Sequence, residues 1–141
     1  MIHAAVLGLV LVVASVGAAA AQSYSKAARY LMAQEIKAAC PLGGRFTSKG
    51  AIERDLNGDG RKDLLLSHGE LRCKGSRTLS KYCGMQVCTV KIFVRQGQLL
   101  KLSSDFLGGG VTLGPTNVPV ISGYAHGGAP WAIRWNGRNF R

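Results

Sequence analysis

A single change in hydrophobic periodicity most constrains the fold of this chain. Residues 24–39 contain neither Gly nor Pro, and their apolar side chains recur at the spacing of one helical face. Pro41 and the glycines that follow it end this pattern. We therefore predict an amphipathic helix of about four turns, with its apolar face in the core rather than against a partner. The side chains of that face are Ala28, Leu31, Met32, Ile36 and Ala39.

From residue 51 onward, apolar residues alternate with polar ones, as in half-buried β-strands. The clearest strand is 87–95, and further strands are predicted at 51–55, 63–68, 98–102, 119–125 and 131–135. Asn136–Gly137 predicts a tight type I′ hairpin turn, and the glycines at 108–110 and 127–128 are interpreted as turns and flexible connections. An N-terminal helix packed on a small, mainly antiparallel sheet is an α+β domain.

The N-terminal residues predict export. Residues 2–21 are apolar or small except for His3 and Ser15, and they end in four alanines. This pattern is typical of a secretory signal peptide at residues 1–21, cleaved after Ala21, although its start lacks Lys and Arg. An uncleaved membrane anchor is the alternative, because about 18 apolar residues can just span a bilayer. After cleavage, residues 22–141 would form one periplasmic or extracellular domain without a membrane span.

All four cysteines follow this segment, and their even number suits an oxidising compartment. Three pairings are possible. We favour Cys83 with Cys88 across a short turn, and Cys40 with Cys73, which would tie the N-terminal segment to the body. Zinc is disfavoured, because the spacings include no Cys-x-x-Cys pair. Disulfide bonds would help a chain of this size, whose single core is modest.

Side-chain oxygens recur on alternate residues between two of the predicted strands. Asp55, Asn57 and Asp59 are followed by a glycine that permits a sharp turn, and Asp63 adds another carboxylate. Ca²⁺ takes six to eight oxygen ligands at about 2.3–2.6 Å, and alternate spacing lets a short loop wrap them around one ion. We predict a calcium loop at residues 55–63, with these four side chains and the main-chain carbonyl of Arg61 as ligands.

The loop differs from an EF-hand, which has a bidentate Glu at its twelfth position, where this chain has Leu66. Its Asp-x-Asn-x-Asp-Gly-x-x-Asp pattern between strands resembles a single copy of the calcium sites in FG-GAP and VCBS-type repeats, which implies the same ligands. Together with Cys73, the segment from Cys83 to Cys88 and the closing residues 134–137, it also resembles small uncharacterised exported proteins of alphaproteobacteria. That second resemblance implies location and fold, and no activity.

A turn that binds no metal is the alternative for this loop. Turn chemistry alone accounts for the pairs Asn57–Gly58 and Asp59–Gly60. It does not account for three carboxylates held together, because like charges repel unless a cation neutralises them. Arg54, Arg61 and Lys62 weaken cation binding, so we expect a weak site with a structural role.

The charge balance predicts anionic partners. The chain has 18 Lys and Arg against 7 Asp and Glu, a formal net charge of +11. Such a charge favours association with polyanions, which for an exported protein are anionic cell-envelope polymers or lipids. A solvated basic surface on a monomer, with no particular partner, is the alternative. Tyr82 is the only aromatic residue in the basic segment 72–82, which argues against specific nucleic-acid binding.

No constellation in the sequence predicts catalysis. His68 next to Ser67, or His126 beside two glycines, would also need an orienting group and an oxyanion site, which the sequence does not place. We expect no catalytic residues and a non-enzymatic, exported, calcium-binding domain. The alternative is a small periplasmic enzyme or inhibitor that uses the His126 region, with calcium in a purely structural role.

Overall fold

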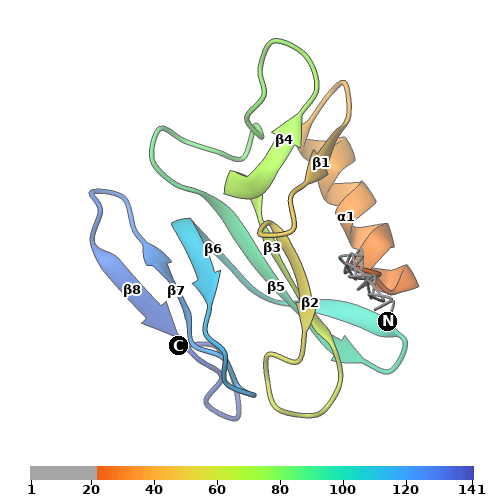
Figure 1. The fold of residues 1–141 in the computed structure, drawn as a ribbon, viewed down its shortest axis with the longest axis vertical. Coiled ribbons are helices and arrows are strands. Elements are labelled where there is room, and N and C mark those ends of the chain that lie inside the picture. The colour runs from red at the N-terminus through yellow and green to blue at the C-terminus, as the bar shows by residue number, and fades with distance from the viewer. Residues whose placement is uncertain (1–21) are drawn as a thin grey trace, which may run out of the picture.

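The computed structural model describes residues 22–141 (Figure 1), so the predicted signal peptide lies outside the described part. One helix is followed by strands that all pair antiparallel, which confirms the α+β class. No helix of the described residues is long and apolar enough to cross a membrane. The elements are α1 (Lys26–Ala39), β1 (Gly44–Phe46), β2 (Ala51–Arg54), β3 (Asp63–Ser67), the 3-10 helix η1 (His68–Glu70), β4 (Leu71–Cys73), β5 (Cys88–Gln96), β6 (Leu99–Leu113), β7 (Ile121–Tyr124) and β8 (Pro130–Ile133).

Helix α1 has a defined cap at each end. The Ser25 hydroxyl accepts a hydrogen bond from the N–H of Ala28 at 3.2 Å, which satisfies one of the free amides of the first turn. At the other end, the N–H of Cys40 donates to the carbonyl of Ile36, and the backbone then becomes extended. The helix therefore begins and ends close to the predicted residues.

Six strands form one sheet in the order β2-β3-β5-β6-β7-β8, and β1 pairs separately with β4. The long strand β6 belongs to both halves of the larger sheet, since its first part pairs with β5 and its last part with β7. Figure 1 shows β6, β7 and β8 on one side of the β2–β3–β5 strands and α1 on the other. The sequence predicted the strands of this sheet, but it missed the short strands β1 and β4.

The interpretation of residues 108–110 as a turn is wrong, because these glycines lie within β6. They leave room for two aromatic rings. A Cβ atom on Gly108 would lie 2.7 Å from the Trp131 ring, and one on Gly109 would lie 2.3 Å from the Tyr124 ring. The strand register also shifts between Gly109 and Thr112, so the chain bends here without leaving the sheet.

Two hydrophobic clusters use opposite faces of the central strands. Leu64 and Leu66 of β3 belong to a cluster that includes Ala28 of α1. Leu65, between them in sequence, belongs to the other cluster, together with Ile121 of β7. Alternate residues of a strand point to opposite faces, so the fully buried run 64–66 supplies both clusters.

The C-terminal turn lies one residue later than predicted. The backbones of Arg134 and Arg141 exchange two hydrogen bonds, and Asn136 donates to the carbonyl of Asn139. Gly137 has a φ of +96°, whereas no residue other than glycine has a positive φ within residues 22–141. A type I′ turn at Asn136–Gly137 would need positive φ at both residues. The central residues are instead Gly137 and Arg138.

Both predicted disulfides are confirmed. Cys40 pairs with Cys73 over 33 residues and joins the end of α1 to β4. Cys83 pairs with Cys88 over 5 residues and closes the loop that enters β5. No cysteine of the described residues is free. The longer link therefore holds the helix end beside the small sheet of β1 and β4.

Candidate calcium loop and its polar surroundings

The predicted calcium loop connects β2 to β3, so its flanks are strands rather than the helices of an EF-hand. The two strands pair in register from Ala51 with Leu66 to Arg54 with Asp63. Within the loop, Gly58 has a φ of +82° and Gly60 a φ of +80°. This left-handed conformation favours glycine, which explains why both positions lack a side chain.

The carboxylate of Asp55 organises the first half of the loop. Its Oδ1 accepts hydrogen bonds from the N–H groups of Asn57, at 3.2 Å, and Gly58, at 2.7 Å. Its Oδ2 accepts one from the N–H of Gly60 at 2.8 Å. The backbone therefore curls around Asp55, which is the arrangement that alternate-residue ligands require.

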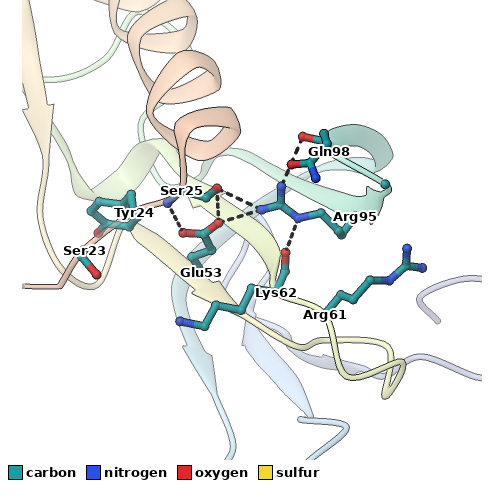
Figure 2. A pocket seen from close by; sticks show the side chains of 9 residues that line it. Ser23, Tyr24, Ser25, Glu53, Arg61, Lys62, Arg95 and Gln98 are labelled. Atoms are coloured by element: carbon teal, nitrogen blue, oxygen red, sulfur yellow. Dashed lines mark hydrogen bonds and ion pairs between the residues drawn. The ribbon is translucent and has the colours of Figure 1, made fainter.

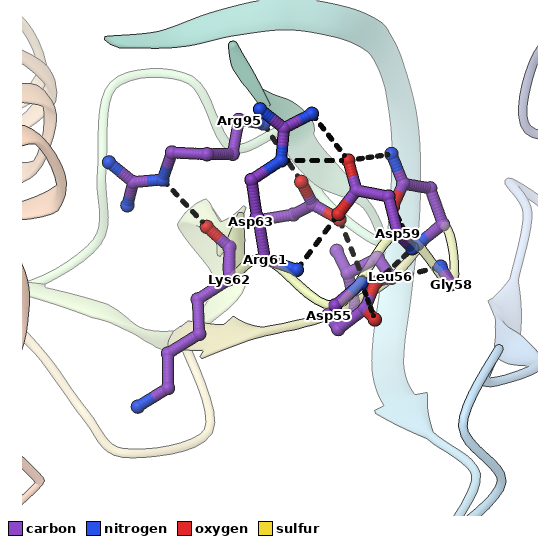
Figure 3. Close-up of polar contacts among 10 residues, drawn as sticks. Asp55, Leu56, Gly58, Asp59, Arg61, Lys62, Asp63 and Arg95 are labelled. Atoms are coloured by element: carbon purple, nitrogen blue, oxygen red, sulfur yellow. Dashed lines mark hydrogen bonds and ion pairs between the residues drawn. The ribbon is translucent and has the colours of Figure 1, made fainter. Parts of the chain in front are cut away.

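Asp59 is bound by its neighbour Arg61 (Figure 3). Its Oδ1 accepts the Arg61 N–H at 2.9 Å, and its Oδ2 accepts the guanidinium at 2.9 Å and the Asn57 amide at 3.4 Å. Slight burial acts to raise the pKa of Asp59, but these hydrogen bonds and the Arg61 charge outweigh it, so the pKa lies below its ordinary value. Arg61, predicted to offer a carbonyl, thus engages the loop through its nitrogen atoms.

Asp63 lies fully buried at the base of the loop. Its Oδ2 accepts the N–H of Leu56 at 2.8 Å, and its Oδ1 accepts the N–H of Arg95 at 2.8 Å. Burial raises the pKa of Asp63; these hydrogen bonds oppose the rise, and the charges of Asp59 and Asp55 add to it. The charges of two loop carboxylates therefore act on the third, Asp63.

The side chains of the loop offer oxygen atoms, which are the type of ligand that a hard cation binds. A carboxylate oxygen that accepts one N–H keeps lone-pair capacity, so the hydrogen bonds of Asp55 and Asp63 still leave acceptor sites. To bind a cation, Asp59 would have to release the Arg61 guanidinium. The Arg61 side chain is 53% exposed, so its charge could be solvated instead. Within residues 22–141, no group of three or more His, Cys, Asp or Glu side chains is gathered for a metal. A cation held by all three loop carboxylates would therefore require Asp59 to release Arg61.

Arg95 of β5 connects the loop to the helix cap (Figure 2). Its guanidinium donates to the carbonyl of Lys62 at 3.0 Å, to Oε1 of Glu53 at 2.8 Å and to the hydroxyl of Ser25 at 2.9 Å. The other Glu53 oxygen accepts the Ser25 N–H at 2.8 Å. Because Arg95 also gives its own N–H to Asp63, one residue joins the loop, β2 and the start of α1. No pattern in the sequence predicted this contact.

His68 lies in a second polar network, with Ser80 rather than its neighbour Ser67. Nδ1 of His68 is 2.8 Å from the Ser80 hydroxyl, and Nε2 is 3.0 Å from Oε2 of Glu35. The His68 hydrogen bond lowers the pKa of Glu35; partial burial opposes this, and the Lys91 ammonium, 2.8 Å from Oε1, lowers it further. An ionised carboxylate can only accept a hydrogen bond, so Nε2 of His68 donates to Glu35.

The order of these contacts is that of a nucleophile, an imidazole and a carboxylate. However, Ser80 is 2% exposed, and its oxygen already accepts the N–H of Tyr82 at 3.1 Å. His68 is fully buried. Each polar atom of the network therefore has a partner inside the protein, as in a polar core network. His126 is exposed in the turn after β7 and is not one of the residues of this network.

The sequence thus identified both disulfides, and its calcium ligands stay a prediction, but it missed the contacts of Arg95, Glu35 and Ser80. In these contacts Arg95 and Glu35 lie 32 to 56 positions from their partners, and Ser80 lies 12 positions from His68. A single sequence carries no signal for such contacts. Comparison of the chain with protein-family models, with curated proteins and with solved structures gave no match.

Proposed function

We propose that this chain is a small exported domain that binds one Ca²⁺ in the β2–β3 loop and has no catalytic activity. The ion would be held by Asp55, Asn57, Asp59 and Asp63 with the carbonyl of Arg61. It would neutralise the three carboxylates and fix the loop. The basic surface would contact anionic components of the cell envelope.

The observation that carries the calcium proposal is the loop around Asp55. Three backbone N–H groups point to one carboxylate, and the charges of Asp55 and Asp59 act on the buried Asp63. The charges of Asp55 and Asp59 oppose the ionisation of Asp63, and a divalent cation would relieve that repulsion. The resemblance to FG-GAP and VCBS-type loops supports the same ligands.

The small number of ion pairs supports the proposal that a basic surface makes the contact. Four of the 18 Lys and Arg side chains form an ion pair with a carboxylate within the described residues. The net charge of +11 is therefore carried by the many side chains left without such a partner. Disulfide bonding at both cysteine pairs supports export to an oxidising compartment. The cluster of Ala28 with Leu64 and Leu66 supports α1 as the cover of one sheet face.

A thermal unfolding scan tests calcium binding. Protein released by cells that express the full chain would be scanned in EDTA, in Ca²⁺ and in Mg²⁺. A ligand that binds only the folded state stabilises by RT ln(1 + [L]/Kd), about 1.4 kcal/mol at ten times Kd, which is roughly 5 °C for a domain of this size. We expect that rise with Ca²⁺ and not with Mg²⁺.

Two variants locate the effect. Asp59→Ala should lose the calcium-dependent rise, because it removes a loop carboxylate that is exposed enough to replace without disturbing the core. Asp105→Ala removes an exposed carboxylate of β6 and should keep the rise. An unchanged midpoint in Ca²⁺, or equal loss of the effect in both variants, would reduce the loop to a turn without a metal.

A further inference from the structure

A cavity of about 450 Å³ gives access to one of the two disulfides. Both Cys83 and Cys88 line it, together with Gly69 of η1 and the bend in β6. These two cysteines are partly exposed, whereas Cys40 is 1% exposed and Cys73 is 7% exposed. A solute can therefore reach the Cys83–Cys88 disulfide, while the Cys40–Cys73 disulfide is enclosed in a hydrophobic cluster.

The surroundings of the two sulfur atoms in the Cys83–Cys88 disulfide differ. Sγ of Cys83 lies 3.4 Å from the carbonyl oxygen of His68. Beside Sγ of Cys88 there is a glycine: a Cβ atom added at Gly69 would lie 3.6 Å from that sulfur and 3.8 Å from Oγ of Ser67. Because residue 69 has no side chain, the space beside the Cys88 sulfur stays open to the cavity.

The cavity also has one side chain of each charge in its wall, Lys49 and Glu70. Lys49 is exposed and forms no ion pair within residues 22–141. Glu70 accepts the Thr47 hydroxyl at 2.8 Å and lies 3.6 Å from the Arg72 guanidinium, and its side chain is 34% exposed. A small solute with both a carboxylate and an ammonium group would find an opposite charge for each.

We propose that the Cys83–Cys88 disulfide is an exchange site for small amino-acid thiols, the class that includes cysteine and glutathione. The thiolate of the small molecule attacks Sγ of Cys88, and a new S–S bond joins the two. The bond between Cys88 and Cys83 breaks, and its electron pair leaves on Sγ of Cys83. Cys83 then takes a proton from solvent, and its S–H donates to the His68 carbonyl.

A second thiol completes the reaction. Its thiolate attacks the small-molecule sulfur of the mixed disulfide, and Cys88 leaves as a thiolate. Two small thiols are thereby oxidised to one disulfide, while Cys83 and Cys88 are reduced by two electrons. The attack must reach a sulfur atom, so the exposed disulfide exchanges and the enclosed one does not. This activity goes beyond the proposed calcium site and does not depend on it.

Mass spectrometry of trapped mixed disulfides tests the proposal. Oxidised protein released by cells that express the full chain is incubated with reduced glutathione at mildly alkaline pH, which increases the thiolate fraction. The reaction is stopped in acid, and fragmentation of the peptides locates each adduct. We expect the adduct on Cys88, formed at least about tenfold faster than any adduct on Cys40 or Cys73.

One variant closes the approach to the sulfur. Gly69→Val should slow adduct formation about tenfold, because its side chain would cover Sγ of Cys88. The φ of Gly69 is not positive and the atom nearest to an added Cβ is 3.6 Å away, so a side chain fits there. Gly114→Val is the matched control, since Gly114 has similar room, 3.5 Å, and does not line the cavity. Urea midpoints check that both variants fold.

A second variant tests the recognition of the small molecule. Lys49→Gln should slow the reaction with glutathione about fivefold, the factor for one contact between opposite unit charges in water. It should leave the reaction with mercaptoethanol, which carries no charge beyond its thiolate, unchanged. Lys101→Gln, at an exposed lysine outside the cavity wall, should change neither rate. Each variant is compared with the parent for the same thiol, so differences in thiol pKa cancel.

Several outcomes would overturn the proposal. These are adducts on Cys40 or Cys73 at the same rate as on Cys88, an adduct confined to Cys83, and equal rates for Gly69→Val and the parent. Equal slowing of glutathione and mercaptoethanol in Lys49→Gln would remove the amino-acid thiol as the preferred partner. The calcium-dependent thermal shift should be the same in Gly69→Val and the parent, so the two proposals fail independently.

Discussion

Arg61 occupies the carboxylate that a cation in the loop would need. Its guanidinium lies 2.9 Å from Oδ2 of Asp59, while its N–H donates to the other oxygen. The sequence shows a basic residue at this position, but not that it turns back onto Asp59. In the proposed calcium complex, Arg61 would therefore compete with the ion for Asp59, and it would also place a like charge near the ion.

Removing that competitor should strengthen calcium binding. Arg61→Ala frees Oδ2 of Asp59 and removes a charge whose repulsion of the ion costs on the order of 1 kcal/mol in water. We expect the calcium dissociation constant from isothermal titration calorimetry to fall about fivefold. Arg138→Ala, which removes the same charge from the C-terminal turn, should leave it unchanged. Equal affinities for Arg61→Ala and the parent would contradict the competition.

The lowered pKa of Glu35 predicts how the free energy of unfolding depends on pH. Its pKa in the folded protein lies below its ordinary value of 4.5, mainly through the His68 hydrogen bond. A lowered folded pKa stabilises the protein above the unfolded value, and this contribution is lost as pH falls through the folded value. Glu35→Gln should therefore cost about 1.5–3 kcal/mol at neutral pH, as for charge-assisted hydrogen bonds, and progressively less below about pH 4.5.

Urea unfolding at a series of pH values measures this effect. The curves of Glu35→Gln and the parent should converge toward acid pH. Asp105→Asn changes an exposed carboxylate, so its free energy of unfolding should stay close to that of the parent at every pH. A constant difference between Glu35→Gln and the parent at all pH values would show that ionisation of Glu35 does not carry the contribution.

At the scale of elements, the two disulfides close loops of different length. In the chain-entropy model, the link over 33 residues contributes about 4 kcal/mol and the link over 5 residues about 2 kcal/mol. Replacing Cys40 and Cys73 by Ala should therefore lower the free energy of unfolding more than replacing Cys83 and Cys88. Urea unfolding of the two double variants checks the order. The reverse order would contradict the model for this fold.

Local sequence patterns predicted the elements that are defined by residues close to one another in the sequence. Helix α1 and the strands β2, β3 and β5 follow from periodicity, because each buries a face that its own sequence defines. The extension of β6 through Gly108–Gly110 did not follow, since glycine usually marks a turn and the rings of Tyr124 and Trp131 come from distant strands. The three-residue strands β1 and β4 are too short for a periodic signal.

At the scale of the whole molecule, polar side chains add links between α1 and other elements to those that the hydrophobic clusters make. Arg95 links the loop to α1 through Ser25 and Glu53. Glu35 links α1 to η1 through His68 and to β5 through Lys91. The calcium ligands are a prediction from residue spacing, whereas these links depend on the finished fold. A change at the loop is therefore expected to reach the start of α1.

The most direct test of calcium binding is a nuclear magnetic resonance titration of ¹⁵N-labelled protein with Ca²⁺. The amides of Gly58 and Gly60, which have positive φ within the loop, should shift and saturate with a single dissociation constant. Gly97 and Gly137, in turns outside the loop, serve as internal controls and should not shift. Gly58 and Gly60 resonances that stay fixed up to saturating Ca²⁺, or shifts of equal size at Gly97 and Gly137, would contradict a calcium site in this loop.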